Sequence, residues 1–180
     1  MALKAALALA QIISIVVFVT AARWYLVPWL RTLTRANALT VLLWPHAFRY
    51  VALQAYSAQQ TGFPISDAGL QRIVYGDIGG MVIAFAAILA LRHRSRFAIA
   101  LVWVLMATTI VDTAANISGG IREHLFGAAT GVTWMVVAFY VPLLMVMIGL
   151  TFWQLYTRRA EVVSSSVSIV PPREAHAMQA

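Results

Sequence analysis

Ionisable side chains interrupt the apolar run WPHAFRYVALQAY at residues 44–56. Its histidine and arginine, His46 and Arg49, are three residues apart. A charged side chain that faces lipid at mid-membrane costs about 3 kcal/mol or more, so such residues usually face other helices and serve ion pathways, proton transfer or ligand binding. The spacing 46, 49, 53 and 56 predicts that His46, Arg49, Leu53 and Tyr56 share one buried helix face.

Two aspartates in other apolar runs are candidate partners of Arg49. Asp77 lies in VYGDIGGM and Asp112 lies in TTIVDTAANI. At about 1.5 Å per helical residue, Arg49 lies roughly 16 Å from one membrane surface, and both aspartates lie roughly 8–9 Å below the other. The forked guanidinium can bridge two carboxylates, so we expect Arg49 to form ion pairs with Asp77 and Asp112.

The residues around Asp112 extend this cluster. Thr109, Asp112 and Asn116 recur at helical spacing and form a polar stripe that is costly in lipid. One arginine facing two aspartates leaves an excess negative charge, and two carboxylates close together in a low dielectric rarely both ionise. His46 is therefore expected to exchange protons with the cluster. The candidate residues for ligand binding or proton relay are His46, Arg49, Asp77, Thr109, Asp112 and Asn116, and no residue is assigned a catalytic role.

The composition identifies the environment of this cluster. The chain has 180 residues, of which 62% are hydrophobic and only 11% are charged. Soluble domains carry charge at about 25% of positions, so this surface must largely face lipid. The net charge of +7 does not indicate nucleic acid, because the basic residues form short groups at the ends of apolar runs.

The apolar runs predict an all-α fold, a bundle of five transmembrane helices within residues 1–159. A helix needs roughly 20 residues to cross the hydrocarbon core. Five runs satisfy this: 5–23, 38–58, 72–91, 97–117 and 131–156. The polar cluster is expected between the second, third and fourth of these helices. Residues 160–180, rich in serine and small residues, are predicted to form a mobile cytoplasmic tail.

Basic residues in the loops predict the orientation of the bundle. With five spans, one side holds Arg31, Arg35, Arg92, Arg94, Arg96, Arg158 and Arg159. The other side holds Lys4, Arg72 and Arg122, with Asp67 and Glu123 beside them. Because cytoplasmic loops are enriched in lysine and arginine, this asymmetry places the N-terminus outside and the C-terminus inside. The expected location is a bacterial cytoplasmic (inner) membrane.

The first apolar run also has the form of a signal peptide, with a basic start and small residues near Ala22. Cleavage there would leave four spans and would place the basic loop RHRSR outside, against the positive-inside rule. A retained first helix is therefore favoured.

Proline and glycine positions predict local features of the helices. Gly76 and Gly80 have the G-x-x-x-G spacing that allows close helix approach, so a neighbouring backbone is expected beside Asp77. Pro142, in the middle of the last run, is expected to kink that helix, and such kinks can open a cavity.

No cofactor or metal site is predicted. The chain has no cysteine, which excludes disulfides, thiolate chemistry and Cys-ligated metals. Haem ligation by His46 would need a second histidine at the same depth, and His93 and His124 fall in loops. The outer-loop residues Asp67, Glu123 and His124 match no specific metal-site spacing.

Two classes of function fit these residues. In the first, a small membrane protein binds a lipid-like ligand at the buried polar cluster or docks to a membrane-protein complex. In the second, a membrane enzyme or proton-coupled carrier uses an aspartate as proton acceptor, Arg49 as an electrostatic clamp and His46 as a relay. Whether the chain is an enzyme is left open. A carrier normally contains repeated halves, and no internal repeat is detectable here.

Overall fold

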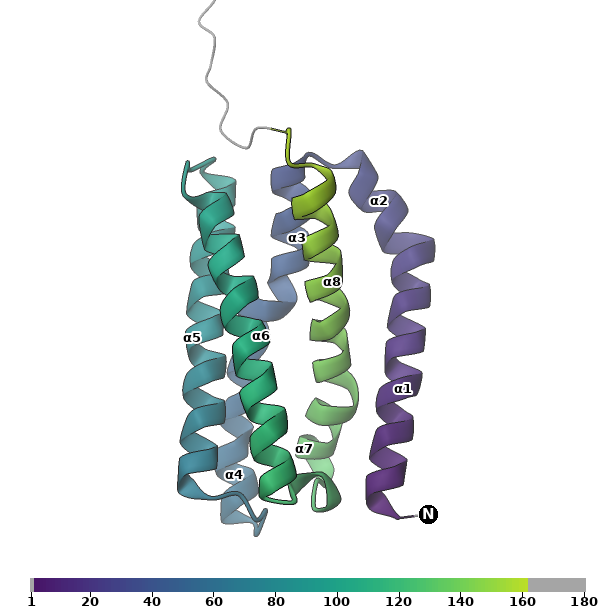
Figure 1. Cartoon of the computed structure of the whole chain (residues 1–180), viewed down its shortest axis with the longest axis vertical. Helices are drawn as coiled ribbons and strands as arrows, with labels where there is room; N and C mark the ends of the chain where they lie inside the picture. Colours follow the sequence, from purple (N-terminus) through teal and green to yellow (C-terminus); the bar gives the residue numbers. More distant parts are fainter. Residues whose placement is uncertain (1, 162–180) are drawn as a thin grey trace, which may run out of the picture.

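The computed structural model describes residues 2–161, and the regular elements within this range are all helical (Figure 1). In chain order they are α1 (Leu3–Ala21), the π-helix η1 (Ala22–Leu26), α2 (Val27–Thr32), α3 (Arg35–Ala47), the 3₁₀ helix η2 (Phe48–Leu53), α4 (Gln54–Gln60), α5 (Asp67–Arg92), α6 (Ala98–Arg122), the 3₁₀ helix η3 (Leu125–Gly127), α7 (Gly131–Met135), the π-helix η4 (Val136–Tyr140) and α8 (Val141–Thr157). The tail predicted for 160–180 lies outside the described residues from 162 onward.

Four continuous helical stretches among the described residues are long and apolar enough to cross a membrane. They are Leu3–Thr32, Asp67–Arg92, Ala98–Arg122 and Gly131–Thr157. The sequence predicts five spans, and the difference is the second one, 38–58. That segment is built from α3, η2 and α4 and contains no continuous α-helix of spanning length.

Pro45 and the 3₁₀ turns after it explain this interruption. Proline removes the backbone donor that would bond the carbonyl four residues earlier, and its ring crowds that carbonyl. Pro45 lies inside α3 near its end, and η2 begins three residues later at Phe48. The carbonyl of Pro45 accepts a hydrogen bond from the hydroxyl of Tyr140 at 2.7 Å, which ties this break to η4.

The 3₁₀ geometry also changes which residues face the interior. A 3₁₀ helix has about three residues per turn, so side chains three apart lie above one another. His46, Arg49, Ala52 and Ala55 are accordingly all buried. The sequence prediction of a face continuing through Leu53 and Tyr56 is wrong, because it assumed 3.6 residues per turn; these two side chains are 46% and 42% exposed.

Each of the two π-helices ends two residues before a proline. η1 ends at Leu26, before Pro28 of α2, and η4 ends at Tyr140, before Pro142, the second residue of α8. The insertion of a π-turn accommodates the missing proline N–H within the helix. A kink was predicted at Pro142, and the structure has a π-helix just before this proline, within the stretch Gly131–Thr157.

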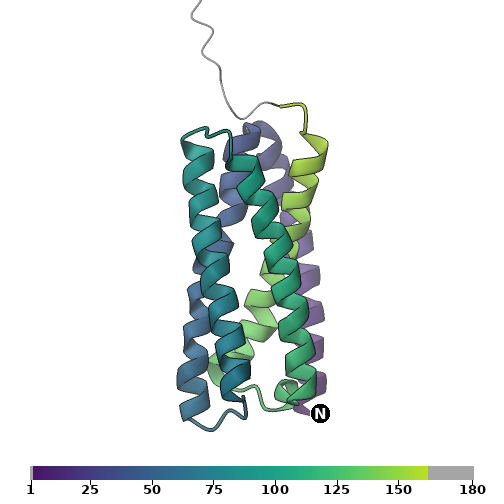
Figure 2. The ribbon, with the colours of Figure 1, turned by 60° about the vertical axis from the view of Figure 1, so that its left-hand side comes forward.

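The helices pack unevenly around the interior. α5 lies between α3 and α6 and contacts both closely, as Figures 1 and 2 show. α1 packs mainly against α8 and η4 and exposes most of its apolar side chains. The main apolar core lies in the half of the bundle that contains the end of α8, where side chains of α3, α5, α6 and α8 meet. It includes Leu43, Ile88, Leu105, Met106 and Leu155.

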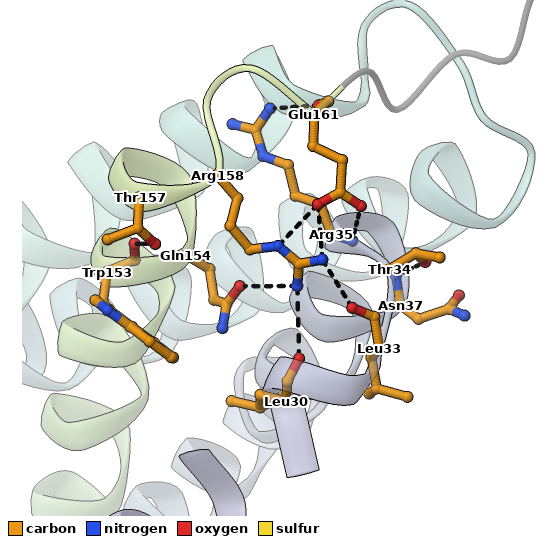
Figure 3. Close-up of polar contacts among 10 residues, drawn as sticks. All are labelled: Leu30, Leu33, Thr34, Arg35, Asn37, Trp153, Gln154, Thr157, Arg158 and Glu161. Carbon is orange, nitrogen blue, oxygen red and sulfur yellow. Dashed lines mark hydrogen bonds and ion pairs between the residues drawn. The ribbon is translucent and has the colours of Figure 1, made fainter. Parts of the chain in front are cut away.

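A group of hydrogen bonds and ion pairs joins the end of α8 to the turn between α2 and α3 (Figure 3). Arg158 donates to the carbonyl of Leu30, in the last turn of α2, and to that of Leu33, directly after α2. Arg35 donates to the carbonyl of Leu155 near the end of α8. The Glu161 carboxylate accepts from the backbone N–H of Arg35 at 2.7 Å and pairs with Arg158. Each arginine thus satisfies carbonyls left free at the other helix end.

Candidate functional site

Arg49 lies at the centre of a polar cluster between η2, α5 and α6. Its Nε donates to Asp77 Oδ1 at 2.6 Å, its Nη1 donates to Thr109 Oγ1 at 3.0 Å, and its Nη2 forms an ion pair with Asp112. The ion pairs predicted from the sequence are therefore present. A buried guanidinium needs several partners to offset its desolvation, and here both adjacent helices supply them.

The polar stripe of α6 is part of the same cluster. Thr109 and Asp112 both contact Arg49, and Asn116 donates its Nδ2 to the second carboxylate oxygen of Asp112 at 3.2 Å. The predicted helical spacing of these three residues thus places them along one side of α6. This line of hydrogen bonds orients the Asp112 carboxylate from both ends.

Two glycines of α5 make room for the charged groups. A Cβ at Gly80 would lie 2.5 Å from Nη1 of Arg49, and a Cβ at Gly76 would overlap the Asp112 carboxylate. The sequence predicted a neighbouring backbone at this G-x-x-x-G spacing. The space is instead filled by the side chains of Arg49 and Asp112, because the cluster itself forms the contact between the helices.

His46 is not joined to the cluster. Its side chain is fully buried, and within residues 2–161 neither ring nitrogen has a hydrogen-bond partner. Each of the three Arg49 nitrogens donates to a side chain of α5 or α6. Proximity along the helix therefore does not produce the hydrogen-bonded relay that the sequence suggested.

A cavity of about 510 Å³ adjoins the cluster. Its walls come from α1, η2, α4, α5, α6 and the stretch from α7 to α8. Twenty of its lining residues are apolar, and the eight polar ones are Gln11, Arg49, Gln54, Asp77, Asp112, Thr113, Asn116 and Thr133. This volume and this mostly apolar lining with a few polar groups are typical of sites for small molecules.

Phe63, Leu125 and Phe126, which come from the loops, line one end of the cavity. Along the helices it is lined by Ile12 of α1, Ile117 of α6 and Met145 of α8, which are 41–59% exposed. This exposed part of the lining, called the mouth below, is thus apolar and lies within the length of the helices.

Four polar residues that line the cavity were missed from the sequence: Gln11, Gln54, Thr113 and Thr133. Gln54 accepts a hydrogen bond from Thr133 at 3.2 Å, and Gln11 donates to the carbonyl of Val137 at 3.2 Å. That carbonyl is free because Val141 donates to Val136 and Pro142 has no N–H. The available signal was simple: isolated polar residues inside apolar runs are usually buried against other helices.

Glu123 holds together the loop before α5 and the loop after α6. Its carboxylate accepts from the backbone N–H of Ser66 at 2.9 Å and pairs with Arg72 at 3.6 Å. The hydrogen bond from Ser66, with the nearby charge of Arg72, lowers the pKa of Glu123. This contact holds the end of α6 beside the start of α5 and so stabilises the end of the cavity that the loops line.

The comparisons with known proteins give a family without an assigned activity. No curated protein and no solved structure matches the chain. The family described as "Domain of unknown function (DUF8737)" matches residues 6–156. This range contains every residue that lines the cavity, from Ala8 to Ile148. The chain belongs to this family of unknown function.

Proposed function

We propose that this chain is a small integral membrane protein that binds a lipid-like ligand in the cavity beside Arg49. One observation carries the proposal: a cavity of about 510 Å³ combines an apolar lining and a lateral apolar mouth with one charged wall. An amphiphile matches this arrangement, because its chain fits the apolar part and its head group fits the polar wall.

The proposal includes five spans with the N-terminus outside. α3, η2 and α4 together run along α5 from one end of the bundle to the other (Figure 1). The α2–α3 turn, the α5–α6 turn and the end of α8 lie at the same end, which supports a single basic, cytoplasmic side. α1 supplies one wall of the cavity, which supports its retention in the mature protein. Placement in a bacterial inner membrane stays a prediction.

Lipid surroundings determine which contacts give such a site its selectivity. Lipid tails are as apolar as leucine, so a ligand that enters from the bilayer gains little from the hydrophobic effect. Hydrogen bonds and charge at the polar wall must therefore distinguish the ligand from bulk lipid. The cluster of Arg49, Asp77, Asp112 and Asn116 is the part of the lining that can do so.

Binding is favoured over catalysis or proton-coupled transport. A relay would require His46 to contact the cluster, and its ring nitrogens have no such contact among the described residues. Docking to a membrane complex would use an outer surface, whereas the charged groups here line an internal cavity. The alternative functions would gain support if purified protein in vesicles moved protons or converted an added lipid.

A tryptophan at Ala8 tests the binding proposal. Ala8 lines the cavity and is exposed, so a large side chain there is expected to block the mouth without overfilling the core. Native mass spectrometry of gently solubilised wild type should show one added mass, reduced about 10-fold or more in Ala8→Trp. That loss corresponds to about 1.4 kcal/mol of binding free energy.

Ala5→Trp is the matched control. Ala5 lies one turn earlier on α1, is exposed and does not line the cavity, and helical side chains lean toward the N-terminus, here away from the mouth. It should retain the added mass. An added mass equally present in both variants, or absent from wild type, would contradict binding in this cavity.

A further inference from the structure

The cavity is faced by the carboxylates of the cluster more than by its arginine. The Asp77 and Asp112 side chains are 19% and 14% exposed, whereas that of Arg49 is 3% exposed. Arg49 directs its Nε and both terminal nitrogens to Asp77, Thr109 and Asp112. A ligand in the cavity therefore meets acceptor oxygens before it meets the guanidinium.

Unused hydrogen-bonding capacity in this wall also belongs to acceptors. Asp112 accepts from Nδ2 of Asn116, which leaves the amide oxygen of Asn116 buried and without a partner within residues 2–161. An ionised carboxylate can only accept, so this amide orientation is required. Asp77 uses one carboxylate oxygen for Arg49, and its second can accept from a ligand.

The net charge of this polar wall is negative when both aspartates are ionised. Arg49 contributes one positive charge, while Asp77 and Asp112 contribute two negative charges when both are ionised. Arg72, whose charge also acts on Asp112, pairs with Glu123 at 3.6 Å and does not line the cavity. The excess negative charge must be balanced by a proton or by a cationic group.

We propose that the cavity takes a single-chain amine, with its ammonium group against Asp77, Asp112 and the free oxygen of Asn116. The inference rests on the proposed function and names the head-group class of its ligand. An ammonium supplies three donors and the missing positive charge. A carboxylate or phosphate head group would face two like charges, and each of the three Arg49 nitrogens already donates to a protein group, which leaves two of its five N–H groups for any other partner.

Three probes that share one chain test the head-group class. Protein in phosphatidylcholine nanodiscs would be titrated with dodecylamine, dodecanol or dodecanoate, and thermal stabilisation would be followed against probe mole fraction. The amine should saturate at a mole fraction about 10-fold lower than the alcohol or the acid, because hydrogen bonds to charged groups contribute that difference.

Asp77→Asn removes the excess charge while leaving one carboxylate for Arg49. In the Asp77→Asn protein, the preference for the amine over the alcohol and the acid should fall about 10-fold. Asp67→Asn is the matched control, since Asp67 is exposed, bonds Gln59 and does not line the cavity. If Asp77→Asn does not fold, Asn116→Leu removes the free acceptor, keeps both ion pairs and should also reduce the preference.

The outcomes separate the two claims. Saturation by the alcohol or the acid at the same mole fraction as the amine would overturn the amine assignment and leave the ligand cavity in place. An amine preference unchanged in both Asp77→Asn and Asn116→Leu would also overturn it. No saturation by any probe, together with no added mass on purified wild type, would overturn the proposed function itself.

Discussion

Replacing Arg49 with methionine is expected to prevent most of the protein from reaching a stable fold. Removing one partner of a buried ion pair costs about 3–5 kcal/mol, because the remaining charge is left uncompensated. Here two carboxylates, Asp77 and Asp112, would lose their counter-ion together. Yield of monodisperse protein and the midpoint of thermal unfolding in detergent would measure the effect.

Two further variants show that the loss comes from charge. Arg92→Met removes an exposed arginine at the end of α5 and should leave the unfolding midpoint nearly unchanged. The triple variant Arg49→Met, Asp77→Asn, Asp112→Asn has no unpaired charge and should recover much of the lost stability. An Arg49→Met protein as stable as wild type would show that the cluster is not buried as described.

Adding a single methyl group at Gly76 or Gly80 should be the second largest effect. A Cβ at Gly80 would meet the Arg49 guanidinium, and one at Gly76 would meet the Asp112 carboxylate. Both contacts are too short to persist, so α5 or the ion-paired side chains must shift. Overpacking of this kind costs about 1–3 kcal/mol, measurable as a lowered unfolding midpoint of Gly76→Ala and Gly80→Ala.

Gly79→Ala is a control on the same helix. A Cβ there meets nothing within 4 Å. Because alanine is a better helix former than glycine, Gly79→Ala should be neutral or stabilise by up to about 1 kcal/mol. Equal destabilisation by all three changes would mean that glycine flexibility, and not space for the charged side chains, determines the effect.

The central ion pairs could be predicted from the sequence, for a physical reason. A charge at mid-membrane must find partners, and Asp77 and Asp112 were the acidic residues at compatible depths. The stripe of Thr109, Asp112 and Asn116 followed from helical spacing alone. Both features depend on local periodicity and depth, which a single sequence carries.

The errors arise where backbone geometry departs from the regular α-helix. Pro45 and the 3₁₀ turns of η2 rotate the chain, so Ala52 and Ala55 take the buried positions expected for Leu53 and Tyr56. The same break explains why four continuous helices of spanning length are present where five were predicted.

The cavity could not be predicted because it depends on long-range packing. Gln54 of α4 accepts a hydrogen bond from Thr133 of α7, far along the chain. Gln11 of α1 donates to the carbonyl of Val137, which the π-turn before Pro142 leaves free. The spacing of residues along the chain does not determine how far two helices diverge or in which direction a helix bends. His46 illustrates the converse, since closeness in sequence did not give it a partner among the described residues.

The most direct test of the ligand cavity is photo-crosslinking in the native membrane. A diazirine-bearing amino acid would be placed at Thr113, which lines the cavity, or at Val111, which is exposed two residues earlier on α6. We expect position 113 to give one discrete adduct mass and position 111 to give the mixture of bulk lipids. The same lipid mixture at both positions, or no adduct at 113, would contradict a selective ligand site beside Arg49.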